Sequence, residues 1–191
     1  RNVTNLPSKL CYQLLKSGFT TLGPDGQYFF DTDHPVGKPG AEASVSNFMG
    51  GAGEAWFIVD ASQAVKPLIW QPRKSFDLVT MFNPDDPNVF WQKEYVYGVD
   101  GRCTAAFGPY WQLAFASKQA VDETNVLAAL TAMSSQKDDD GTPLEVMGTH
   151  FVCSPTLAEA ARKLFALDKL ASGADNTLKG RLQVVSAAWL L

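Results

Sequence analysis

The feature that most constrains the fold of this chain is a change in its hydrophobic pattern near residue 120. Before it, short β-branched and aromatic runs alternate with polar or proline-containing turns, which indicates strands. After it, apolar residues at helical spacing alternate with short apolar runs, which indicates alternating helices and strands. The pattern therefore predicts an α+β protein with a β-rich part, residues 1–118, and an α/β part, residues 119–191.

The β-rich part has several expected strands, at residues 55–60, 67–71, 76–81, 89–106 and 110–117. The segment NPDDPN at residues 83–88 interrupts them. In the long strand expected at 89–106, Trp91, Tyr95 and Val99 fall on one face, which predicts a half-buried surface. Residues 31–54 are rich in glycine, proline and serine and show little periodicity. They predict a long loop of the kind that packs on a partner or moves.

Three helices are expected, each with a recognisable start. The first covers residues 7–17, with proline in its first turn and Gly18 as its stop. The second covers residues 123–135, with Asp122 as its N-cap. The third begins at Ser154 and Pro155, which suit the N-cap and the first helical position. Strands at residues 149–153 and 180–185 complete the α/β part.

Composition and charge exclude several classes of function. The chain has 191 residues, 46% of them hydrophobic, and a formal net charge of −4. Its 16 Lys and Arg residues are scattered among 20 acids, without the clustered basic face that binding to phosphate requires. No stretch approaches the ~20 apolar residues that span a bilayer. We therefore expect no sequence-specific nucleic acid and no membrane as partners. The three cysteines form no CxxC motif, which is typical of reduced thiols.

A search for reactive groups identifies no catalytic, cofactor-binding or metal site. Of the two histidines, His150 begins an expected strand, where a structural role is the simpler interpretation. His34 follows Asp31 and Asp33, which resembles a metal cluster or a hydrolase site. A turn closed by Pro35 explains the same residues.

Two further motifs fail their templates. On the calcium-loop pattern with Gly141 as the central glycine, the acidic run 138–140 places Gln136 first and Met147 last, where a glutamate is required. The glycine-rich run 50–53 lacks the Lys and Ser or Thr of a phosphate-binding loop and is interpreted as a hinge.

Six segments, in the same order and covering nearly all of the chain, resemble the major head subunit of Mu-like phages. They are LLKSGF with DGQYFFDTDHP, AWFIVDASQAVKPLIWQPRK, VFWQKEYVYGVDGRCTAAFGPYWQLA, QKDDDGTPLEVMGTHFVCSPTLAEAARKLF and NTLKGRLQVV. The resemblance implies the Johnson fold of tailed-phage capsid proteins. In that fold a peripheral lobe has a spine helix and a long-stranded sheet, and an axial lobe is α/β. Residues 1–118 would then belong to the peripheral lobe and residues 119–191 to the axial lobe.

The resemblance implies a structural subunit, not an enzyme, that assembles with copies of itself into hexamers and pentamers enclosing DNA. It also implies a scaffold and a protease as assembly partners, and the virion, or the host cytoplasm during assembly, as its location. Family members carry roughly a hundred further residues before this start, enough for a separate domain. We expect these to include the N-terminal arm and the extended hairpin that clasps neighbours, so that this chain lacks both. Alone it would be monomeric or weakly associating, without closed shells.

Two other functions stay open. One is a small hydrolase that uses Asp31, Asp33 or His34. The other is an aromatic-rich β module that binds a ligand or carbohydrate through exposed tryptophans, with Trp56, Trp70 and Trp91 as candidates.

Overall fold

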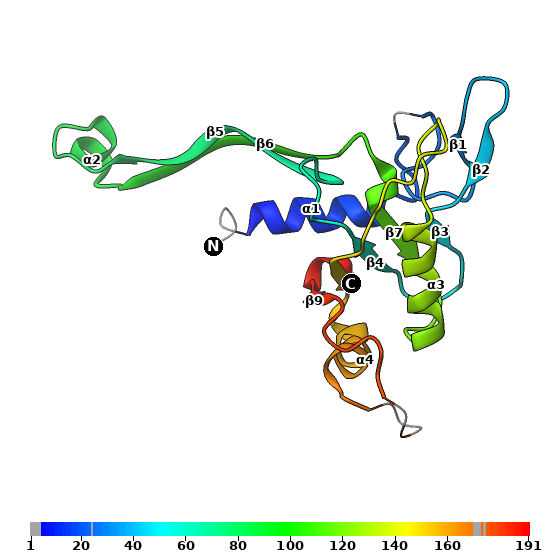
Figure 1. The fold of residues 1–191 in the computed structure, drawn as a ribbon. Helices are drawn as coiled ribbons and strands as arrows, with labels where there is room; N and C mark the ends of the chain where they lie inside the picture. Colours follow the sequence, from blue (N-terminus) through cyan, green and yellow to red (C-terminus); the bar gives the residue numbers. More distant parts are fainter. Residues whose placement is uncertain (1–4, 24, 170–172, 174) are drawn as a thin grey trace.

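The computed structural model describes residues 5–23, 25–169, 173 and 175–191 (Figure 1). A body built around a five-stranded sheet carries a long two-stranded ribbon that projects away from it. The helices and strands of the body are α1 (Leu6–Ser17), β1 (His34–Val36), β2 (Ala43–Val45), β3 (Phe48–Met49), β4 (Trp56–Val59), η1 (Trp111–Leu113), β7 (Ala114–Ser117), α3 (Glu123–Ser134), β8 (His150–Cys153), α4 (Pro155–Ala166), β9 (Gln183–Ser186) and η2 (Ala188–Leu190).

The central sheet has the strand order β3-β7-β4-β8-β9. β4 runs antiparallel to both of its neighbours, whereas β3 is parallel to β7 and β8 is parallel to β9. The sheet takes β3, β4 and β7 from residues before 118 and β8 and β9 from residues after it. The division of the chain near residue 118 stays a prediction, and the two parts share this sheet.

Both faces of the sheet are covered, as the fully buried sequence Trp56–Val59 requires. Strand side chains alternate between faces. Trp56 and Ile58 join a cluster with α3 and α4, whereas Phe57 and Val59 join a second cluster with α1, Phe29 and Phe30. Burying one such side chain contributes about 1.5–3 kcal/mol. The two clusters therefore fix the helices on opposite sides of one sheet.

The three expected helices and the expected strands at 55–60 and 149–153 are confirmed within one or two residues. Asp122 caps α3 by accepting a hydrogen bond from the Asn125 backbone N–H at 2.7 Å. Gly18 follows α1 as expected, but it does not adopt the left-handed conformation of a usual glycine stop. Its φ is −60°, and a Cβ there would lie 2.6 Å from the Phe30 ring. Glycine lets the helix end pack against that ring.

The segment 31–54 is more ordered than its sequence predicts. It contains the antiparallel pair β1 and β2 and the short edge strand β3. These strands have only two or three residues, too few for a periodic pattern. Gly51 has a φ of +115°, and a Cβ there would lie 2.4 Å from the Lys118 carbonyl oxygen. Gly51 and Gly53 therefore permit close packing against the Lys118 backbone, and the interpretation of this run as a hinge stays a prediction.

The ribbon consists of β5 (Leu68–Met81) and β6 (Val96–Phe107), with the short helix α2 (Pro87–Gln92) at its tip. β5 merges the two strands expected at 67–71 and 76–81, with register irregularities between Pro72 and Asp77. The strand expected at 89–106 is wrong over its first residues, because Pro87 occupies the start of α2. The face expected to be half-buried is exposed.

This ribbon also corrects a larger expectation. The chain was expected to lack an extended hairpin, yet residues 68–107 form one (Figure 1). In this two-stranded ribbon each strand hydrogen-bonds to one neighbour only, so the pairing of β5 with β6 alone determines its extent.

Candidate assembly surface

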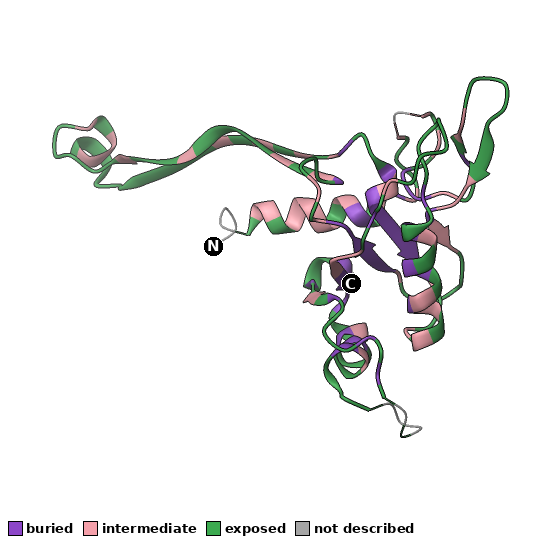
Figure 2. Cartoon of the chain, viewed as in Figure 1, coloured by how far each residue is buried: buried purple, intermediate pink, exposed green. Residues whose placement is uncertain are grey.

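The distal part of the ribbon is mostly exposed (Figure 2), and many of its exposed side chains are large and apolar. Between residues 78 and 99, ten large apolar side chains are each at least 42% exposed: Leu78, Val79, Met81, Phe82, Phe90, Trp91, Tyr95, Val96, Tyr97 and Val99. Contiguous apolar surface of this kind marks an interaction site. The ribbon is therefore the candidate functional site of the chain.

The strand register places these side chains on both faces of the ribbon. Leu78 pairs with Val99 and Thr80 with Tyr97, so these four residues share one face. Met81 pairs with Val96 on the opposite face, next to Val79. A two-stranded hairpin is at best marginally stable in water on its own. Neither apolar face of the ribbon packs against the body, so we expect another molecule to cover these faces.

The tip of the ribbon holds its aromatic side chains in a fixed arrangement. Phe90 and Trp91 contact edge to face, with ring centroids 4.9 Å apart, and Trp91 is 78% exposed. Asn88 Nδ2 donates a hydrogen bond to the Glu94 carbonyl oxygen at 2.9 Å, which ties α2 to the following strand. Lys93 ends the helix in the left-handed conformation, with φ of +54°. Tryptophan is among the residues that contribute most to binding energy when a protein interface covers them.

The base of the ribbon is anchored firmly to the body. Phe107, the last residue of β6, stacks on the buried Phe29 with ring centroids 3.8 Å apart. The Gly108 N–H donates to the Pro67 carbonyl oxygen at 2.8 Å, so the two strands stay paired where they leave the body. α1 packs beside both strands. The orientation of the ribbon is therefore set by the core and not by a linker.

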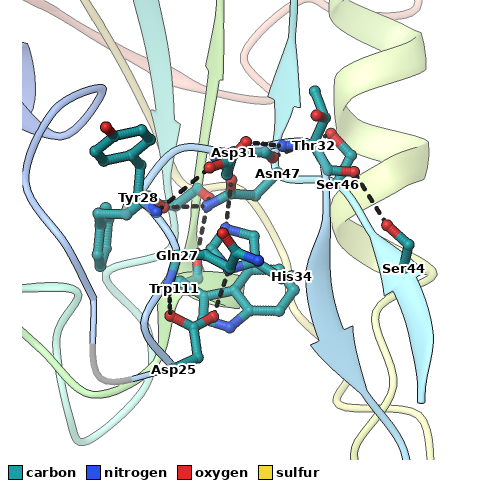
Figure 3. Close-up of polar contacts among 12 residues, drawn as sticks. Asp25, Gln27, Tyr28, Asp31, Thr32, His34, Ser44, Ser46, Asn47 and Trp111 are labelled. Atoms are coloured by element: carbon teal, nitrogen blue, oxygen red, sulfur yellow. Dashed lines mark hydrogen bonds and ion pairs between the residues drawn. The ribbon is translucent and has the colours of Figure 1, made fainter. Parts of the chain in front are cut away.

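The residues of the alternative hydrolase site lie outside the ribbon. Two of them, Asp31 and His34, make polar contacts within the body (Figure 3). His34 is fully buried, stacked on Trp111 at 3.9 Å between ring centroids. Its Nδ1 lies 2.6 Å from Asp25 Oδ2 and its Nε2 lies 3.2 Å from Asn47 Oδ1. Each ring nitrogen thus faces a side-chain oxygen of a neighbouring residue. No ring nitrogen is left to face a substrate.

Asp31 and Asp33 do not join His34 in a site. The Asp31 carboxylate accepts hydrogen bonds from the backbone N–H groups of Tyr28 and Thr32 at 3.3 and 2.7 Å, and Asp33 is exposed. The partner of His34 is Asp25, which sequence reasoning missed. Asp25 lies nine residues earlier in a turn, and no local spacing signals the contact.

His150 and Trp56, two further candidates from the sequence, make contacts within the body. His150 Nδ1 lies 2.8 Å from the Thr149 hydroxyl at the start of β8. Trp56, expected to be exposed, is fully buried and donates its Nε1–H to the Gln119 carbonyl oxygen at 2.8 Å, because β4 lies in the middle of the sheet. Trp70 is half-buried, which leaves Trp91 as the one of the three on an open surface.

The acidic run before Gly141 forms a turn that contacts the β1–β2 hairpin. Asp139 Oδ1 accepts a hydrogen bond from the Gly37 N–H at 3.1 Å, and Asp140 pairs with Lys38 at 3.4 Å. Over residues 5–23, 25–169, 173 and 175–191, no three His, Cys, Asp or Glu side chains gather as a metal site would require. Within the same residues, no helix has the length and hydrophobicity to cross a bilayer.

Comparisons with known proteins point to one family. The sequence model of the family described as Mu-like prophage major head subunit gpT matches residues 1–190. The Mu-like prophage FluMu major head subunit of Haemophilus influenzae is 38% identical over 164 residues, which cover 82% of this chain and 53% of that protein. The major capsid protein of Escherichia phage Mu is 36% identical over 200 residues, covering all of this chain and 65% of that protein.

Comparison with solved structures also identifies phage capsid proteins. The chain superposes on a protein in the procapsid of bacteriophage JBD30 with a TM-score of 0.85 and 40% sequence identity. The match covers 96% of this chain and 63% of that one. The fold is thus the α+β fold of phage capsid proteins, as the sequence predicts. The chain spans between about half and two thirds of the length of these relatives.

Proposed function

The chain belongs to the family of Mu-like prophage major head subunits, and we propose that it is a shell-building part of a phage or prophage head. In this proposal, copies associate into hexamers and pentamers that together enclose DNA. The observation that carries it is the projecting ribbon, whose two apolar faces and aromatic tip lack cover within the described chain. A shell subunit has a use for such a surface, because copies of the same protein meet it in the assembled wall.

The same proposal assigns no reaction to the chain and no catalytic, cofactor-binding or metal-binding residue. His34, the residue around which a hydrolase would be built, has side-chain partners on both ring nitrogens. The proposal places the subunit in the virion, and in the host cytoplasm while heads assemble. A scaffold and a maturation protease are its proposed partners at that stage. Residues 1–118 are assigned to a peripheral lobe and residues 119–191 to an axial lobe.

Subunits that carry this sequence provide the test. The triple variant Leu78→Thr, Trp91→Ser, Tyr97→Thr removes apolar surface from the ribbon, and threonine keeps a high strand propensity at the two strand positions. Because these side chains are exposed, we expect each change to alter the free energy of unfolding by no more than about 0.5 kcal/mol. Electron microscopy should show that assembled heads are lost.

The matched control is Met147→Thr with Leu167→Thr, since these residues are 67% and 51% exposed but lie outside the ribbon. The control should assemble as the parent does. Normal head yield from the triple variant would show that the ribbon is not an assembly surface.

A further inference from the structure

A buried amide oxygen lacks a hydrogen-bond donor just after α3. The amide belongs to Gln136, which is 3% exposed. Its Nε2 donates a long hydrogen bond to the Ser46 carbonyl oxygen at 3.4 Å, whereas its Oε1 accepts none within the described chain. Exchanging the two atoms would set Oε1 against that carbonyl oxygen, where two acceptors would meet. Buried polar groups are nearly always paired, so the free Oε1 points to a donor from outside the chain.

Gln136 lines a cavity between the β1–β2 hairpin and the acidic turn that precedes Gly141. The cavity has a volume of about 240 Å³. Its apolar wall belongs to the hairpin and includes Val36, Ala43 and Val45. Its polar wall includes Gln136, Asp138 and Asp139, and Lys137 also borders it. Because both aspartates are exposed, the polar wall reaches the surface of the molecule.

The contacts that hold the turn leave acceptor atoms free at this wall. Asp139 Oδ1 accepts a hydrogen bond from the Gly37 N–H at 3.1 Å, and Asp138 Oδ1 accepts one from the Asp139 N–H at 2.8 Å. Over the residues that the structure describes, neither carboxylate forms an ion pair. Lys38 pairs with Asp140 instead. The second oxygen of each aspartate and the Gln136 Oε1 therefore remain available to a ligand.

These acceptors and the apolar wall together suit an arginine side chain. A guanidinium carries several N–H donors on one planar group and binds carboxylates strongly. Its methylene stem can pack along apolar side chains while the charged end stays near water. Calcium fits less well, because it takes about six to eight oxygen ligands, more than this wall supplies.

The chain itself presents arginines that lack partners. Arg73, Arg102, Arg162 and Arg181 are exposed, and none of them forms an ion pair over the described residues. We infer that the cavity beside Gln136 receives an arginine side chain of a second copy of this chain. The inference rests on the proposed function, which brings copies side by side. It assigns the receiving surface to the body and not to the ribbon.

A peptide probe tests the cavity in the full 191-residue chain. The probe is a blocked Gly-Arg-Gly peptide, and its control carries citrulline, a neutral group of similar shape, in place of arginine. Nuclear magnetic resonance should show saturable shifts of the Gly37 and Gly141 amides and of the Gln136 side-chain amide with the arginine peptide only. The double variant Asp138→Asn, Asp139→Asn keeps an oxygen for each backbone contact but should weaken binding at least about tenfold, because charge-assisted hydrogen bonds are lost.

Gln136→Met separates a binding role from a packing role. Methionine fills similar space and removes the buried acceptor, so the denaturation midpoint of the free chain should be unchanged or higher. Binding of the arginine peptide should nevertheless weaken severalfold. A lower midpoint combined with unchanged peptide binding would assign Gln136 to packing alone and overturn the inference.

Sedimentation equilibrium at low salt tests the source of the arginine. The arginine peptide and the Asp138→Asn, Asp139→Asn variant should each reduce association of the chain. The single variants are Arg73→Gln, Arg102→Gln, Arg162→Gln and Arg181→Gln. One of them should lower the association constant about tenfold, and adding the two asparagines to it should cause no further loss.

The matched control is Glu159→Gln with Asp168→Asn, which removes two acidic charges from exposed ion pairs elsewhere on the body. It should bind the peptide and associate as the parent does. Equal weakening in the control would mean that overall charge, and not the cavity, governs association, and it would overturn the inference.

The remaining outcomes also decide the matter. Equal binding of the citrulline peptide shows that the cavity does not recognise the positive charge. Larger shifts with calcium chloride than with the peptide identify a metal site. Peptide binding without an effect of any of the four arginine variants places the arginine on another protein. Each of these results overturns the inference, whereas the proposed function fails separately, through normal head assembly by the apolar triple variant.

Discussion

At the scale of single residues, the polar groups of this chain are organised for stability. Asn47 is 1% exposed and joins three separate segments. Its Nδ2 donates to the carbonyl oxygens of Phe29, Trp111 and Ala114 at 2.8, 3.4 and 3.3 Å. Its Oδ1 accepts from the Asp31 N–H at 2.9 Å and faces His34 Nε2. These contacts fix the orientation of the amide and connect the segment around His34 to the edge of the sheet.

We predict that Asn47→Ala lowers the free energy of unfolding by about 3 kcal/mol or more, because several buried groups lose their partners together. Chemical denaturation of the purified chain measures the change. Asn83→Ala, at an exposed position on the ribbon tip, should stay within about 0.5 kcal/mol of the parent. Equal effects of the two substitutions would contradict the assigned role of Asn47.

Cys153 gives a second prediction at this scale. Burial raises the pKa of its thiol to about 11, the charge of Arg162 acts in the opposite direction, and Glu54 makes a smaller raising contribution; the exposed surface of Cys153 is 0%. Because the thiolate is the reactive form, Cys153 should resist thiol reagents at pH 8 in the folded protein. It should react fully only after denaturation, as peptide mass mapping of the labelled cysteine will show. Labelling of folded Cys153 as fast as of half-buried Cys103 would count against this environment.

At the scale of elements, the sequence predicts the body well. Strong signals mark the starts of α3 and α4, where Asp122 and Pro155 occupy the expected positions. The buried run at residues 56–59 and the apolar run at 150–153 become adjacent central strands. Local patterns carry this information because both faces of the sheet are buried, so that the side chains of residues 56–59 and 151–153 are all apolar.

The ribbon is harder to predict from the same kind of pattern. Its alternating apolar and aromatic residues are typical of strands packed on a core, and a partner in an assembly produces the same signal. The pattern therefore predicts the strands but not their exposure. The expectation that the chain lacks an extended hairpin comes from the family resemblance and not from this pattern. The Asp25–His34 contact was missed for a related reason, since tertiary packing brings the two residues together.

Hydrogen exchange tests whether the ribbon opens independently of the central sheet. The amides of residues 78–81 and 96–99 should exchange much faster than those of β4 and β8 in the unassembled chain. The ribbon can open locally without exposing the core, whereas the central strands exchange only through larger unfolding. Protection should rise in the ribbon when copies associate. Ribbon amides as slow as those of β4 in dilute samples would contradict this account.

At the scale of the whole molecule, a body built around one five-stranded sheet carries a projecting ribbon with exposed apolar faces. A single ribbon contact is narrow, and small interfaces are typically weak. In a closed shell each subunit makes many contacts at once, so that weak contacts together give a stable wall. The fold of the phage capsid relatives and the exposed ribbon thus support the same proposal from independent directions.

The most direct measurement is electron cryomicroscopy of heads assembled from subunits that carry this sequence. The account predicts that the exposed apolar side chains between residues 78 and 99 of each copy lie against neighbouring subunits, with Trp91 covered. A shell in which these ribbons point into solvent and the subunits meet through other surfaces would contradict it.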